Sequence, residues 1–195
     1  MKEQLIPLGP MIVDLTGLVL TDEDRRRLKH PMAGGVILFG RNFKSRAQVS
    51  KLIRAIRAVR PNIIISVDHE GGRVQRFKTD GFTHLPSMRT LGELYADNPL
   101  HAVKIASQVG YVLAAELRAV GVDYSYTPVL DLDYGGSTVI GDRAFSPSAE
   151  VVAMLAKALL HGMLRGGWSA VASIFRDMVL WWRIRMWICR SISAV

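Results

Sequence analysis

Residues 63–77 read Ile-Ile-Ile-Ser-Val-Asp-His-Glu-Gly-Gly-Arg-Val-Gln-Arg-Phe. The apolar run that ends at Val67 is typical of a buried parallel strand, and the charged Asp68 follows it directly. In an α/β barrel the functional residues lie where strands end, so Asp68 is a candidate site residue. Arg73 and Arg76 are three positions apart, and a helical turn would place both on one side of the chain.

These residue types indicate what the rim could bind. A carboxylate and guanidinium groups suit a polyhydroxyl ligand, because they accept hydrogen bonds from hydroxyls and donate hydrogen bonds to them with fixed geometry. Gly71 and Gly72 let the backbone turn sharply or approach a ligand closely. We expect His69 to be a packing or rim residue, and Glu70 to pair with Arg73 or cap the next turn. The alternative is a strand end with a solvated salt bridge, and spacing alone leaves both open.

Short apolar runs alternate with longer helical patterns along the chain. Strands are expected at 11–15, 34–39, 62–67 and 122–127, and helices are expected from residue 21 and at 45–60, 101–120 and 148–165. Repeated strand–helix units predict an α/β fold with a parallel sheet and right-handed crossovers. Only about four units fit, whereas a closed (β/α)8 barrel needs eight strands and about 250 residues.

Composition limits the function classes. The chain has 195 residues and is 49% apolar, which is enough for one domain with a core. The net charge is +8, but the basic residues form no long block, so no nucleic-acid partner is expected. A single cysteine, Cys189, allows no internal disulfide and no metal cluster. No uncharged run is long enough to span a membrane, and Glu3 and Asp14 interrupt any signal-peptide pattern, so a cytoplasmic location is expected.

Four further motifs flank the 67–77 stretch in a fixed order. They read Gly-Gly-Val-Ile-Leu-Phe at 34–39 with Arg-Asn-Phe at 41–43, Phe-Thr-His-Leu-Pro at 82–86, Tyr-Thr-Pro-Val-Leu-Asp at 126–131, and Ile-Gly-Asp-Arg-Ala-Phe at 140–145. From about residue 10 to about residue 170, this ordered set resembles glycoside hydrolase family 3, in its single-domain bacterial β-N-acetylglucosaminidase branch. An ordered set is far more specific than any one motif.

The resemblance implies a fold, an activity and a binding site. It implies the incomplete N-terminal half of a TIM-like (β/α)8 barrel. It implies retaining hydrolysis of terminal non-reducing β-N-acetylglucosamine from peptidoglycan fragments, without a cofactor or metal, so that the partners are N-acetylglucosaminyl muropeptides. Asp68 matches the family aspartate that grips sugar hydroxyls, Arg76 matches the second arginine of Gly-Gly-Arg-Val-Gln-Arg, and Arg143 matches the arginine of Ile-Gly-Asp-Arg. Asp131 matches a structural rim residue.

The groups that react with the sugar have no match in this chain. In the family branch the acid/base is a histidine in a loop ending Asp-Ser-His, and the nucleophile is an aspartate on a much later strand. We therefore expect the 195 residues to be an inactive, truncated form, with no catalytic residue to assign. Alternatives are a β-glucosidase-like or phosphorylase-like family member, or a non-catalytic sugar-binding or membrane-associating remnant. Open strand edges also predict non-native self-association.

The last residues change character. All four tryptophans and the only cysteine fall within the last 28 residues. Deleting one nucleotide from codons for Lys-His-Phe-Pro-Gly-His-Gly, the loop that family members have here, gives codons for Ser-Ile-Phe-Arg-Asp-Met-Val, which is the sequence of residues 173–179. We therefore expect a partial barrel domain at 1–171 and an out-of-frame tail at 172–195. The alternative interpretation of the tail is a basic, tryptophan-rich membrane-surface segment.

Overall fold

The computed structural model describes residues 7–168, and within them the four strands form one parallel sheet. The strands are β1 (Met11–Asp14), β2 (Ala33–Leu38), β3 (Ile64–Val67) and β4 (Tyr124–Ser125), and they lie side by side in chain order. Asp14 pairs with Ile37, and Val67 pairs with both Leu38 and Ser125. The carboxyl ends of the strands therefore meet at one edge of the sheet, and the predicted α/β class is confirmed.

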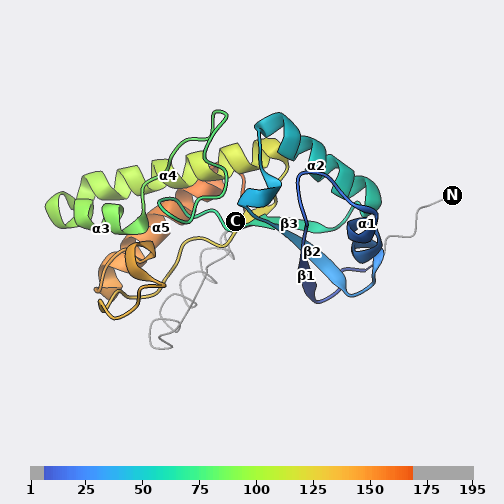
Figure 1. The fold of residues 1–195 in the computed structure, drawn as a ribbon. Helices are drawn as coiled ribbons and strands as arrows, with labels where there is room; N and C mark the ends of the chain where they lie inside the picture. Colours follow the sequence, from blue (N-terminus) through green and yellow to red (C-terminus); the bar gives the residue numbers. More distant parts are fainter. Residues whose placement is uncertain (1–6, 169–195) are drawn as a thin grey trace.

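Five helices connect and cover these strands. They are α1 (Asp22–Lys29), α2 (Arg46–Val59), α3 (Met88–Asp97), α4 (Pro99–Val120) and α5 (Ala149–Arg165), with short 3₁₀ turns η1 (Gly40–Asn42) and η2 (Gly141–Arg143). Figure 1 shows α1 and α2 beside β1–β3, with α3, α4 and α5 grouped beyond them. The sequence predicted each of these helices except α3. No described helix has the length and apolar character needed to cross a membrane.

Side-chain caps explain where three of the predicted helices begin. Thr21 and Asp24 form a capping box at the start of α1: each side chain accepts a hydrogen bond at 3.1 Å from the other residue's backbone N–H. Ser45 Oγ accepts from the Gln48 N–H at 3.2 Å at the start of α2. Ser148 caps α5 in the same way. Each cap satisfies a backbone donor that the first helical turn leaves unpaired.

The core lies between the sheet and the helices. Four apolar residues, spaced three or four apart along one face of α2, are at most 2% exposed: Val49, Leu52, Ile53 and Ile56. They share one core cluster with Val36, Leu38, Ile65 and Val67 of the strands. On β3, Ile65 and Val67 are 0% exposed and Ser66, on the opposite face, is 1% exposed, whereas Ile64 is 37% exposed. The carboxyl-terminal part of β3 is therefore buried on both faces, as is typical of a parallel strand.

The strand predicted at 122–127 is shorter than expected. Ladder pairing of β4 is confined to Tyr124 and Ser125. The Ile65 N–H donates to the Asp123 carboxylate at 2.7 Å, and the side chain thereby takes the place of a backbone acceptor. Pro128 has no N–H to continue the ladder. The ladder between β3 and β4 is therefore only two residues long.

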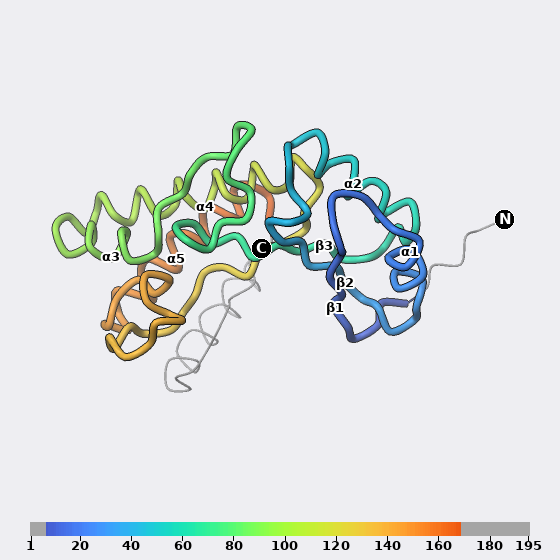
Figure 2. The backbone as a smooth tube through the Cα atoms, in the orientation of Figure 1, coloured from blue at the N-terminus to red at the C-terminus, as the bar shows by residue number. Residues whose placement is uncertain are grey.

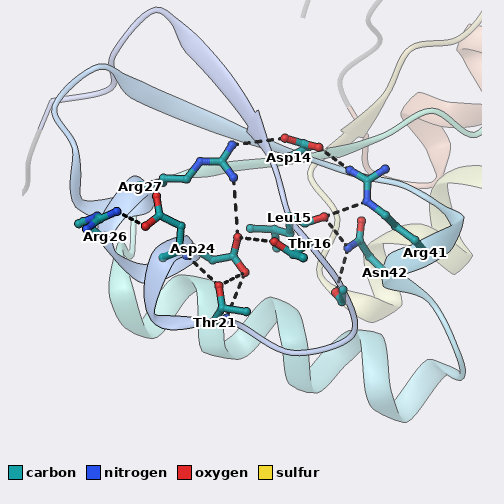
Figure 3. A network of polar contacts seen from close by, with 11 residues as sticks. Asp14, Leu15, Thr16, Thr21, Asp24, Arg26, Arg27, Arg41 and Asn42 are labelled. Carbon is teal, nitrogen blue, oxygen red and sulfur yellow. Dashed lines mark hydrogen bonds and ion pairs between the residues drawn. The ribbon is translucent and has the colours of Figure 1, made fainter.

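The carboxyl end of β1 is fixed by a polar network (Figure 3). Asp14 receives hydrogen bonds from Arg27, at 3.3 Å, and from Arg41. Asn42 Nδ2 donates to the Leu15 carbonyl at 3.2 Å and to a second carbonyl, that of residue 17, at 2.9 Å. The loop after β1 and the turn after β2 are thereby held together at the same edge of the sheet.

Within the described residues β1 and β4 each have a strand neighbour on one side only. Met11 and Ile12 on β1 are 53% and 48% exposed. Self-association through these edges stays a prediction. The segment predicted to be out of frame, 172–195, lies outside the described residues.

Candidate sugar-binding site

The loop after β3 is built as a tight turn. Gly71 and Gly72 have φ angles of 106° and 53°, which side-chain-bearing residues rarely adopt. The Glu70 N–H donates to the Val74 carbonyl at 2.6 Å, and the Val74 N–H donates to the Gly71 carbonyl at 3.1 Å. A Cβ atom on Gly71 would lie 2.3 Å from the Pro86 carbonyl oxygen. The turn therefore needs glycine for conformation and for space. Figure 2 shows the chain, in green, making a long irregular excursion before α3.

This turn separates the two arginines that a helical turn would have placed on one side, so that prediction is wrong. Arg73 lies near the tip of the turn, where its Nε donates to Asp142 at 2.7 Å. Arg76 lies just after the turn, where its Nη2 donates to Asp68 at 2.7 Å. The positive φ angles at Gly71 and Gly72 explain the difference, because they reverse the chain instead of continuing a helix.

Asp68 and Arg76 form a half-buried ion pair beyond the end of β3. Their side chains are 24% and 29% exposed, so both remain open to a ligand on one side. The Arg76 guanidinium also lies 6.0 Å from the centroid of the Phe39 ring, at the end of β2. The pair therefore lies at the edge of the sheet where the strands end.

Glu70 and Arg143 form a second, more deeply buried pair. Arg143 Nε and Nη2 donate to the two carboxylate oxygens at 2.9 and 2.6 Å, and the side chains are 2% (Glu70) and 13% (Arg143) exposed. The prediction that Glu70 pairs with Arg73 is therefore wrong. The two partners are 73 positions apart in the chain. No local spacing rule could have found this contact, although each partner lies in one of the quoted motifs.

Burial and charge act against each other at Glu70. Burial raises the pKa of its carboxyl, and the hydrogen bond from Arg143 lowers it. The nearby carboxylate of Asp68 raises the pKa of Glu70 further, because like charges repel. The hydrogen bond to Glu70 raises the pKa of Arg143. The four side chains therefore form two neighbouring ion pairs, Arg76–Asp68 and Arg143–Glu70, whose carboxylates lie close enough to affect each other's charge.

The three residues predicted to bind sugar are thus brought together. Asp68 and Arg76 contact each other, and Arg143 pairs with Glu70, two residues further along the chain from Asp68. The Asp68 carboxylate can accept from hydroxyls and the guanidinium groups of Arg76 and Arg143 can donate to them, while Glu70 is buried against Arg143. Glu70 is the residue that sequence reasoning did not assign to this group.

The neighbouring candidates have packing roles, as predicted for His69. Its side chain is 1% exposed and lies edge-on to Phe77 at 5.9 Å between ring centroids. Burial, followed by the positive charges of Arg76 and Lys78, lowers the pKa of His69 to about 3. Asp131 is 5% exposed. Among residues 7–168, no group of His, Cys, Asp or Glu has the arrangement needed to hold a metal ion.

Comparison with known proteins identifies relatives. Residues 10–176 match the N-terminal domain of glycosyl hydrolase family 3. A β-hexosaminidase from Bordetella avium is 58% identical over 175 residues, which are 89% of this chain and 50% of that protein. The chain therefore spans about half the length of the curated relatives that it matches.

Solved structures agree with this match. NagZ from Neisseria gonorrhoeae, crystallised with N-trifluoroacetyl-D-glucosamine, superposes with a TM-score of 0.84 at 48% identity, and the match covers 89% of this chain and 50% of NagZ. A β-N-acetylglucosaminidase from Paenibacillus gives 0.75 at 30% identity, over 84% of this chain and 31% of that protein. The described strands and helices are therefore part of a TIM-barrel-like fold, and the chain belongs to glycosyl hydrolase family 3.

Proposed function

We propose that this chain supplies the sugar-gripping half of a β-N-acetylglucosaminidase. The single observation that carries the proposal is the arrangement of two neighbouring ion pairs, Arg76–Asp68 and Arg143–Glu70, beyond the ends of parallel strands. Function in barrels of this kind lies at that edge. The relatives named above support an N-acetylglucosamine ligand, since one is a β-hexosaminidase and another was crystallised with an N-acylated glucosamine.

The proposed reaction is retaining hydrolysis of terminal β-N-acetylglucosamine from peptidoglycan fragments. Such hydrolysis needs a nucleophile and an acid/base on either side of the scissile bond. Asp68, Arg76 and Arg143 would bind and orient the non-reducing sugar, and Glu70 would hold Arg143 in place. The 195 residues contain no match to the family's acid/base loop or to its nucleophile strand, so the chain alone would bind without turnover. A cytoplasmic location and muropeptide substrates stay predictions.

Titration with N-acetylglucosamine, followed by ligand-observed NMR, tests the proposal. We expect saturable binding by the 195-residue chain, weaker binding of glucose, and binding lost in Asp68→Ala. Arg54→Ala is the matched control: Arg54 is exposed on α2, and its side chain contacts no other described residue through a hydrogen bond or ion pair. Equal binding of glucose would favour the β-glucosidase-like alternative. Undiminished binding of N-acetylglucosamine by Asp68→Ala would show that the site lies elsewhere.

A further inference from the structure

Segment 133–143 carries Arg143, yet it has little apolar packing of its own. Tyr134 and Val139 are 70% and 66% exposed, and none of residues 134–143 has a buried side chain. The segment follows β4 and lies beside α3, where Figure 2 shows it in orange. A segment with so few buried contacts opens easily unless polar contacts hold it. The position of Arg143 therefore depends on what anchors this segment.

One side chain from the turn after β3 makes most of the anchoring contacts. Arg73 Nε donates to the Asp142 carboxylate at 2.7 Å. Its Nη2 donates to the Val139 carbonyl at 2.6 Å and lies 3.3 and 3.4 Å from the carbonyls of Thr138 and Ile140. The planar guanidinium thus spans the whole stretch 138–142, and only arginine has a fork that can do this.

Arg89 on α3 fixes the same segment from a second direction. It donates to the Gly141 carbonyl at 3.1 Å and forms an ion pair with Asp133. The backbone of Arg143 is bonded to this anchored stretch, since the Arg143 N–H donates to the Ile140 carbonyl at 3.0 Å. Arg143 Nη1 also lies 3.4 Å from the Val139 carbonyl, which is the carbonyl nearest to Arg73 Nη2 in this stretch. Displacement of residues 139 and 140 would therefore move the Arg143 guanidinium.

We propose that Arg73 is a positioning residue of the sugar site: it anchors segment 138–142 and thereby places the guanidinium of Arg143. Arg73 itself donates to Asp142 and to the loop carbonyls. It forms no hydrogen bond with the Arg76–Asp68 pair or the Arg143–Glu70 pair. The proposal rests on the proposed function only in assigning the placed guanidinium to a sugar. The anchoring of segment 138–142 by Arg73 rests only on the hydrogen bonds of Arg73 to that segment.

Amide hydrogen exchange of residues 138–143 tests the anchoring. In Arg73→Ala we expect exchange to be about five- to tenfold faster there, because several hydrogen bonds to partly exposed groups are lost. Arg73→Lys should be intermediate, since an ammonium can pair with Asp142 but cannot span the carbonyls. Arg54→Ala should leave exchange in this segment unchanged. Unchanged exchange in Arg73→Ala would overturn the proposal.

Sugar affinity distinguishes positioning from a purely structural role. We expect Arg73→Ala to raise the Kd for N-acetylglucosamine about fivefold, with the remaining fold unchanged as judged by exchange in β2 and β3. Faster exchange with an unchanged Kd would overturn the assignment of Arg73 to the site.

If the unaltered chain binds no sugar, the proposed function has failed, and the position of Arg143 is then measured by phenylglyoxal modification mapped by mass spectrometry. Because the Arg143 side chain is only 13% exposed, increased modification in Arg73→Ala would support the positioning role. Unchanged modification would overturn it.

Discussion

When residues 1–171 are joined to the carboxyl-terminal half of the Bordetella avium β-hexosaminidase, we expect an active enzyme whose kcat/KM falls strongly in Asp68→Ala. The two proteins are 58% identical over the matched region, so the halves should fit. Loss of a charge-assisted contact inside a sugar site leaves polar groups unpaired and costs on the order of 2–4 kcal/mol, or about 30- to 800-fold in rate.

Steady-state assay with a chromogenic β-N-acetylglucosaminide measures this effect. Arg76→Ala and Arg143→Ala should give losses of similar size, and Arg54→Ala should retain the activity of the unaltered chimaera. If the chimaera with Asp68→Ala kept near-normal kinetics, Asp68 would not grip the substrate. The same chimaera also tests the boundary at residue 171, because an in-frame continuation from that point must restore the barrel.

The second large effect concerns stability at the Glu70–Arg143 pair. We expect Arg143→Ala to lower the free energy of unfolding by about 3 kcal/mol at pH 7.5, because it leaves a buried carboxylate without its partner. The double variant Glu70→Gln/Arg143→Met should lie within about 1 kcal/mol of the unaltered chain, since neither charge remains to be desolvated. Urea unfolding at a concentration where the chain is monomeric measures both.

The loss of unfolding free energy in Arg143→Ala should be smaller at low pH than at neutral pH. Burial raises the pKa of Glu70 in the folded state above its ordinary value of 4.5, so the folded chain binds that proton more tightly than the unfolded chain does. The contribution of Glu70 to stability is fully present below 4.5 and is lost as pH rises through the folded pKa. Without Arg143 the folded pKa should rise further. The cost of Arg143→Ala should therefore shrink between pH 7.5 and pH 5, and a cost that grew on acidification would contradict this account.

Much of the fold could be predicted because its signals are local. Thr21, Ser45 and Ser148 each stand where a helix begins, and the apolar stripe on α2 is buried as its spacing indicates. Helix α3 was missed although Ser87 caps it and Met88 and Leu91 are buried, because its apolar pattern is short and leads almost directly into α4. The length of β4 depended on a side-chain contact between Asp123 and Ile65, which no pattern along the chain reveals.

The site could be predicted only in part, for a related reason. Asp68, Arg76 and Arg143 were predicted through motif resemblance, and the structure places them in two neighbouring ion pairs, Arg76–Asp68 and Arg143–Glu70. The predicted partner of Glu70, Arg73, was wrong. Arg73 is near Glu70 in sequence, but the side chain that contacts Glu70 is that of Arg143. The left-handed conformation of two consecutive glycines reverses the chain there and determines which arginine faces which carboxylate.

We propose that these 195 residues hold groups that bind the sugar but not the groups that cleave its bond. The most direct test is a turnover assay of the purified 195-residue chain with a chromogenic β-N-acetylglucosaminide, run beside the chimaera as a positive control. We expect a rate equal to the blank, because the 195 residues contain no match to the family's acid/base loop or to its nucleophile strand. Turnover clearly above the blank that persists through further purification would contradict it.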